Sequence, residues 1–100
     1  MNELHSWFSG QHPGLRTCKT LQLRLARFAA DHPEQRAMCR LLCGIIHSYV
    51  EAFDEAPLPT ATADRAYRRL LRTLAEFDAA AEPARQLGQL NRLAELDLVQ

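Results

Sequence analysis

Glycine, lysine and net charge are all scarce in this chain, and each shortage excludes a class of protein. The chain has four glycines and five prolines among 100 residues, and it shows no low-complexity tract and no internal repeat of solenoid length. Lys19 is the only lysine among twelve basic residues, and twelve acidic residues bring the formal net charge to zero. Proteins that coat nucleic acids carry an excess of positive charge, which neutralises phosphates and releases their counterions, and this chain has no such excess. Nucleic-acid binding is therefore disfavoured.

Cysteine and long apolar runs are also in short supply. The three cysteines, Cys18, Cys39 and Cys43, cannot all pair with one another, so we predict no disulfide framework. No secretory signal pattern opens the sequence, and no apolar run reaches the roughly 20 residues of a membrane span. We expect a reduced, cytoplasmic protein with no membrane partner, whose cysteines are small buried apolar groups.

Helical periodicity, in contrast, runs almost from end to end. Leu4, Trp7 and Phe8 have the i, i+3, i+4 spacing of one helical face, which predicts a short helical arm over residues 1–12. Pro13 is a favoured first helical residue and is predicted to open the first long helix. Its apolar stripe starts at Leu15, and the helix should end near residue 31.

Residues 33–56 form the most apolar stretch of the chain. Asp31 and Glu34 have the spacing of a capping box, which predicts a short link and a new helix beginning at Pro33. A helix that is apolar on most sides must be covered on most sides, so we expect a central helix with more apolar area than a small core can cover. Gly44 falls in its narrow polar strip. A mid-helix glycine costs roughly 1 kcal/mol relative to alanine, which is tolerable if another backbone approaches closely there.

Prolines punctuate the second half of the chain. Residues 57–60 are predicted to be a loop, after which Thr60 or Thr62 caps a third helix. Pro83 should begin a shorter fourth helix rich in leucine. Together the patterns predict an all-α, compact four-helix bundle-like domain over residues 13–100, with three long helices, a shorter C-terminal helix and the arm at residues 1–12.

No motif in the sequence indicates an enzyme or a cofactor site. The nearest approach is the series Cys39, Cys43 and His47, which recurs every fourth residue along one helix. Thiolates and imidazole are ligands for Zn or Cu(I), so a metal-binding or thiol-redox protein is one alternative reading. Buried structural thiols with a surface histidine are the favoured interpretation, because the usual zinc-site spacings are absent.

Charged side chains gather at two places in the second half. Arg65, Arg68, Arg69 and Arg72 crowd one predicted helix and could grip phosphates, which makes a nucleic-acid-binding regulator the second alternative. Glu51, Asp54 and Glu55 lie at the end of the preceding helix. We expect arginines 65, 68 and 69 to lie near these carboxylates, because the proline loop brings the next helix back past the same end.

The favoured function is that of a non-catalytic regulatory or adaptor protein of bacterial type: an antiactivator, an inhibitor or a chaperone-like protein. It would bind another, larger protein through a helix face, with an apolar centre and an arginine rim, and we also expect a homodimer. Aromatic and arginine side chains dominate such interfaces. The candidate partner-binding residues are Trp7, Phe8, Tyr49, Arg65, Arg68, Arg69, Arg72 and Leu90.

Overall fold

The computed structural model describes residues 2–77 and 82–99, and it confirms the all-α prediction. Its elements are, in chain order, α1 (Asn2–Ser9), α2 (Leu15–Asp31), a short 3₁₀ turn η1 (Pro33–Gln35), α3 (Arg36–Ala52), α4 (Thr60–Glu76) and α5 (Pro83–Ala94). No helix in the described ranges has the length and hydropathy needed to cross a bilayer.

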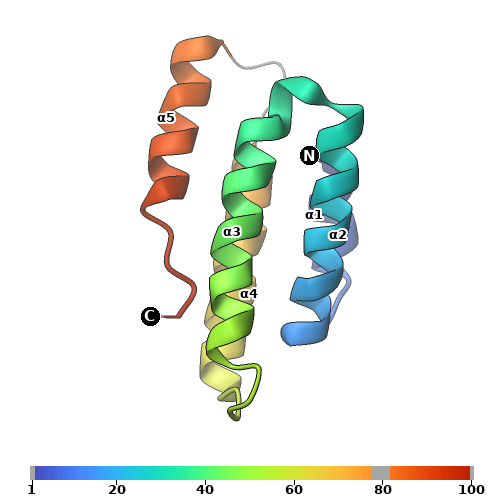
Figure 1. Cartoon of the computed structure of the whole chain (residues 1–100), viewed down its shortest axis with the longest axis vertical. Coiled ribbons are helices and arrows are strands. Elements are labelled where there is room, and N and C mark those ends of the chain that lie inside the picture. Colours follow the sequence, from blue (N-terminus) through green and yellow to red (C-terminus); the bar gives the residue numbers. More distant parts are fainter. Residues whose placement is uncertain (1, 78–81, 100) are drawn as a thin grey trace.

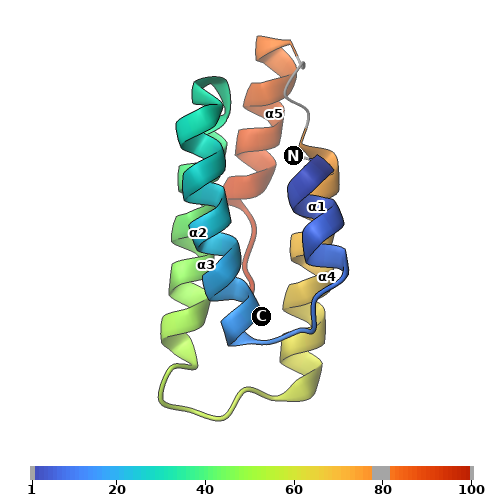
Figure 2. The same ribbon diagram turned by 90° about the vertical axis from the view of Figure 1, so that its right-hand side faces the viewer.

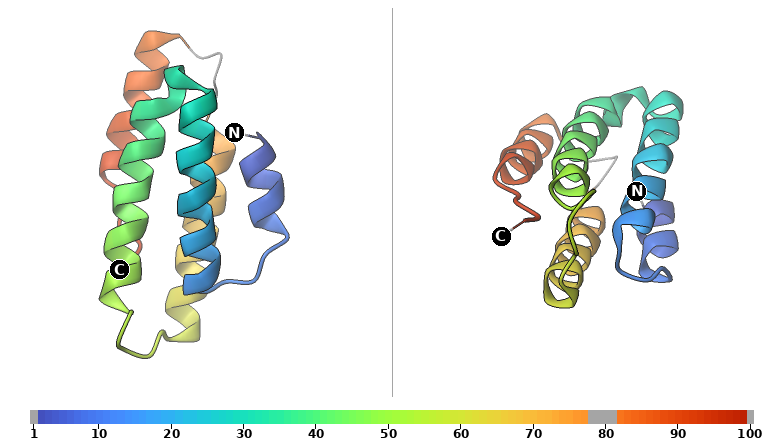
Figure 3. Two further views of the ribbon diagram at one scale, coloured as in Figure 1. Left: turned by 45° about the vertical axis from the view of Figure 1, so that its right-hand side comes forward. Right: turned by 60° about the horizontal axis from the view of Figure 1, so that its bottom comes forward.

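The helices run along one common direction in an elongated bundle of 41 × 23 × 19 Å. α2 and α3 form an antiparallel hairpin, α5 packs beside α3, and α4 lies behind α3 (Figure 1). α1 lies against both α2 and α4 (Figures 2 and 3). This arrangement leaves one long side of α3 facing away from the other helices.

Several helix ends differ from the sequence prediction. α2 begins at Leu15 rather than Pro13, and α3 begins at Arg36 after the η1 turn rather than at Pro33. The predicted capping box is wrong: Asp31 is the last residue of α2, and neither η1 nor α3 has a side-chain cap. α3 also ends at Ala52, four residues early. There the backbone N–H of Phe53 bonds to the carbonyl of Val50, which tightens the last turn.

α3 is the central helix, as predicted. Its inner side supplies six buried side chains to the core: Met38, Cys39, Leu42, Ile46, Tyr49 and Val50. Leu41, at 36%, is its only large apolar side chain that is at least about a third exposed. The expectation that the bundle cannot cover this helix is therefore wrong for most of its length. The neighbouring helices α2 and α5 contact α3, and its buried side chains share one core cluster with those of α4.

The N-terminal segment is helical as predicted, and it contributes directly to the core. Phe8 is fully buried and Leu4 is 5% exposed. The hydroxyl of Tyr67 on α4 donates a 2.8 Å hydrogen bond to the Phe8 carbonyl, and the two rings lie 4.8 Å apart. On its other side, the Arg24 guanidinium lies 4.2 Å from the Trp7 ring centre. α1 is therefore held by both α2 and α4.

Candidate interaction surfaces

The arginines of α4 divide into two groups. Arg65, Arg68 and Arg72 are exposed and follow the i, i+3, i+7 spacing of one face; we call them the arginine stripe. No ion pair in the described ranges engages any of the three. Arg69 is different, because its guanidinium donates to the backbone carbonyl of Asp97 and so ties the segment after α5 to α4. The structure thus leaves three of the four predicted arginines available for a partner.

A cavity of about 180 Å³ lies between α4 and α5. Gln89 reaches across it, and its side-chain amide donates a 2.5 Å hydrogen bond to the Glu76 carbonyl. Three guanidinium groups line the cavity, but two carboxylates line it as well, so its charge is nearly balanced. The charged lining residues are Arg69, Arg72, Arg92, Glu76 and Glu95. Such a balance gives no strong preference for an anionic ligand.

A second hollow, a groove of about 480 Å³, follows the junction of α2 and α3. Small apolar side chains line its base: alanines of α2 and two cysteines of α3. Arg36 and Arg40 form its α3 edge, and both are exposed. The other lining residues are Leu25, Ala26, Ala29, Ala30, Cys39 and Cys43.

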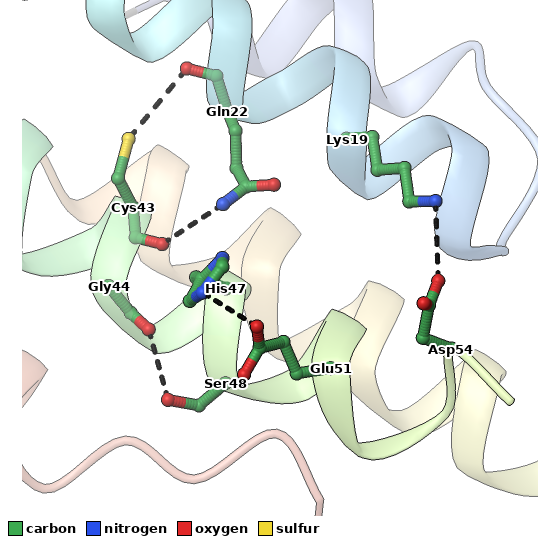
Figure 4. Close-up of polar contacts among 8 residues, drawn as sticks. All are labelled: Lys19, Gln22, Cys43, Gly44, His47, Ser48, Glu51 and Asp54. Carbon is green, nitrogen blue, oxygen red and sulfur yellow. Dashed lines mark hydrogen bonds and ion pairs between the residues drawn. The ribbon is translucent and has the colours of Figure 1, made fainter.

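Gly44 lies in the middle of the side of α3 that faces outward. No backbone approaches closely there in the described residues, because a Cβ built on Gly44 would meet nothing within 4 Å. Glycine costs a helix interior about 1 kcal/mol relative to alanine, so this residue weakens α3 without a compensating contact in the described bundle. Two further residues on this side are small: Ala37 and Ser48, whose hydroxyl donates to the Gly44 carbonyl (Figure 4). Longer side chains flank them, those of Arg40, Leu41 and His47.

The carboxylates at the end of α3 do not meet the arginines of α4. Glu51 pairs instead with His47 at 3.2 Å, and Asp54 pairs with Lys19 of α2 at 3.7 Å (Figure 4). The prediction of arginine partners is therefore wrong. It failed because Glu51 pairs within its own helix and Asp54 pairs with a residue of α2 (Figure 4).

Cys39, Cys43 and His47 do not converge on a common point. Cys39 is fully buried, Cys43 donates its thiol hydrogen to the Gln22 carbonyl, and His47 turns to Glu51 (Figure 4). Burial raises the pKa of the Cys39 thiol to about 11 and also raises that of Cys43, so both stay protonated near neutral pH. Within the described ranges, no three His, Cys, Asp or Glu side chains are placed to hold a metal ion.

The apolar candidates lie deeper than a docking surface requires. Phe8 is fully buried and Tyr49 is 1% exposed, so both serve the core, while Trp7 and Leu90 are half-buried. Among the described residues, the most exposed large apolar side chain is that of Leu23 of α2, at 68%. It was not among the candidates, although its position off the apolar stripe of its own helix was a usable signal.

Comparisons with protein-family models, with curated proteins and with solved structures give no match for this chain. The functional argument therefore depends on the geometry and chemistry of the surfaces described above.

Proposed function

We propose that this protein is non-catalytic and acts by binding other proteins through its exposed helix faces. The observation that carries the proposal is the arginine stripe: three exposed guanidinium groups on one side of α4, with no carboxylate paired to them. The partner is a larger protein with an acidic surface. The protein would serve as an antiactivator, an inhibitor or a chaperone-like adaptor, and it would associate with itself as a homodimer.

Arginine suits this role for a physical reason. Its planar fork of donors can bind a carboxylate through two parallel hydrogen bonds, which fixes the orientation of a partner. A single solvent-exposed pair contributes only about 0–1 kcal/mol, so no one arginine carries the binding. A row of three raises the rate of encounter with an acidic surface and sets the register of docking.

The same stripe could face the phosphates of a nucleic acid, and the two readings predict different measurements. Phosphate binding would weaken steeply and log-linearly with salt, because each contact releases counterions. Protein binding at an acidic patch with an apolar centre would depend less steeply on salt. The zero net charge of the chain favours the protein partner.

The test compares two triple variants that remove the same number of positive charges. One carries Arg65→Glu, Arg68→Glu and Arg72→Glu on the stripe. The control carries the same change at Arg16, Arg27 and Arg85, which are exposed on other helices. Affinity capture from a lysate of the source cells, followed by binding measurements with each purified partner, should recover a protein with the wild type and the control but not with the stripe variant.

Two results would contradict this proposal. Recovery of the same partners by the stripe variant would show that α4 is not the docking face. Tight binding of a mixed-sequence DNA or RNA duplex at physiological salt, lost only in the stripe variant, would favour the nucleic-acid reading instead.

A further inference from the structure

We propose that the outer face of α3 is the interface through which two copies of this chain pair, with their α3 helices antiparallel. The outer face consists of the exposed residues Arg36, Ala37, Arg40, Leu41, Gly44, His47, Ser48 and Glu51. This inference deepens the homodimer part of the proposed function, on which it rests, and it is independent of the arginine stripe on α4.

The first argument is steric. Gly44 is at the centre of the outer face, exposed and with open space where its Cβ would be. Ala37 and Ser48, each within two helical turns of it, have short side chains as well. These three short residues form a narrow line between the longer side chains of Arg40 and His47 on one side and Leu41 on the other. A second helix can approach closely along that line, which is the usual reason to keep a glycine inside a helix. The described bundle itself supplies no such neighbour.

The second argument is the order of charges along the face. Arg36 and Arg40 lie in the first half of α3 and Glu51 in the second half, with Asp54 and Glu55 just beyond the helix. Consider two copies related by a two-fold axis that is perpendicular to α3 and passes through Gly44. A residue that follows Gly44 by a given number of positions in one copy then lies opposite the residue that precedes Gly44 by the same number in the other copy. Glu51 then lies opposite Ala37, between the two arginines of the second copy, whereas a parallel pair would oppose like charges.

This order of charges also indicates that the partner that binds the face is a second copy of the same chain. The face is positively charged on one side of Gly44 and negatively charged on the other. In an antiparallel pair each half therefore lies opposite the half of the second copy that has the opposite charge, so no other partner is needed. In the described residues Arg36 and Arg40 have no ion pair of their own, and Glu51 has only the exposed His47. The second copy would therefore supply carboxylates to two arginines that lack them.

Apolar side chains border the face and would add to the contact. Leu41, on the face itself, is 36% exposed, and Leu23 of the adjacent helix α2 is 68% exposed. Leu23 is level with the middle of α3, because its neighbour Gln22 bonds to the Cys43 carbonyl through its side-chain amide at 3.3 Å (Figure 4). Pairing at Gly44 would bring the Leu23 side chains of both copies close to the two-fold axis and cover them.

The first experiment measures the dimer dissociation constant by sedimentation velocity over micromolar to millimolar concentrations. The wild type should dimerise, and Gly44→Trp should raise the dissociation constant by about tenfold or more, since a bulky group would separate the two helices. Ala61→Trp, on the exposed side of α4, is the matched control and should have no effect. Circular dichroism checks that both variants keep their helices, which is expected because both sites are exposed.

The second experiment tests the antiparallel arrangement by exchanging charges. Arg36→Glu/Arg40→Glu and Glu51→Arg should each dimerise about tenfold more weakly than the wild type, because each opposes like charges across the interface. An equimolar mixture of the two should form heterodimers, since every charge then meets its opposite. The fully exchanged variant, Arg36→Glu/Arg40→Glu/Glu51→Arg, then tests the direction. An antiparallel pairing predicts that it dimerises with itself and not with the wild type, whereas a parallel pairing predicts the reverse.

Each other outcome has a definite meaning. A wild type that stays monomeric up to millimolar concentration overturns both the homodimer and this interface. A dimer that tolerates Gly44→Trp overturns the interface and leaves the homodimer standing. Loss of dimer in both charge variants without recovery on mixing overturns the pairing of charges across α3. A fully exchanged variant that dimerises with the wild type rather than with itself overturns the antiparallel geometry.

Discussion

α1 and α5 are the two short helices of the bundle, and they bury their apolar side chains very differently. α1 has eight residues and buries Phe8 completely, together with most of Leu4. α5 has twelve residues and more leucines, yet it buries Leu93 and leaves Leu87 58% exposed. The comparison teaches that length and leucine content do not decide how deeply a helix enters a core.

Two physical differences explain the contrast. The apolar residues of α1 are spaced to share one face, whereas leucines every third residue in α5 turn by about 60° per step around the helix. α1 also lies in the angle between α2 and α4, while α5 packs mainly along α3 (Figure 2). A helix between two neighbours covers its apolar face from both sides.

The largest effect should come from removing the anchor of α1. Phe8→Ala deletes a fully buried ring that packs on Tyr67, and we expect a loss of about 3–5 kcal/mol in the free energy of unfolding. Urea denaturation monitored by circular dichroism measures it. Ser6→Ala, an exposed change on the same helix, is the control. A loss below about 1 kcal/mol would show that α1 is only loosely attached.

Removing the anchor of α5 should cost somewhat less. Leu93→Ala empties a site that is 3% exposed, and we expect a loss of about 2–4 kcal/mol in the same urea titration. The cost falls below that of Phe8→Ala because a smaller side chain is deleted and α5 has fewer neighbours to hold the cavity open. A cost equal to or above that of Phe8→Ala would reverse the comparison between the two helices.

The sequence predicted the existence of these elements well and their surroundings poorly. The start of α5 at Pro83 and the existence of a helix after the proline loop are confirmed. The predicted cap by Thr60 or Thr62 is wrong, because α4 starts at Thr60, its N-cap is Pro59 and it has no side-chain cap. The place of α1 in the core was not predictable, because its hydrogen bond comes from Tyr67, which is 59 residues away in the sequence. The capping box failed for a related reason. The η1 turn takes up the residues that the box would have used.

The candidate surfaces show the same division. Helical spacing correctly grouped Arg65, Arg68 and Arg72 on one exposed side of α4. It could not separate Arg69 from them, because the acceptor of Arg69 is a backbone carbonyl at Asp97. Similarly, nothing in the local pattern indicated that Asp54 would pair with Lys19, which depends on the α2–α3 hairpin. Contacts between distant segments decide these cases.

A smaller effect is expected where α1 meets α4. Tyr67→Phe keeps the ring against Phe8 and deletes only the hydroxyl that bonds to the Phe8 carbonyl at 2.8 Å. We expect a loss of about 1 kcal/mol in the free energy of unfolding, the usual net value of one hydrogen bond. Amide exchange should also quicken in α1 relative to α3, because α1 would detach more readily. An unchanged stability would mean that ring packing alone holds α1 in place.

The smallest effect should come from the exposed leucine of α5. Leu87→Gln retains a good helix former at a site that is 58% exposed, so the free energy of unfolding should change by no more than about 0.5 kcal/mol. Measuring at two protein concentrations tests whether a second molecule covers this leucine in solution. A loss above about 1 kcal/mol that grows with protein concentration would place Leu87 in an intermolecular contact. In that case, α5 would be exposed in the single chain because it binds a second molecule, and not because it packs weakly. The difference between α1 and α5 would then reflect assembly as well as folding.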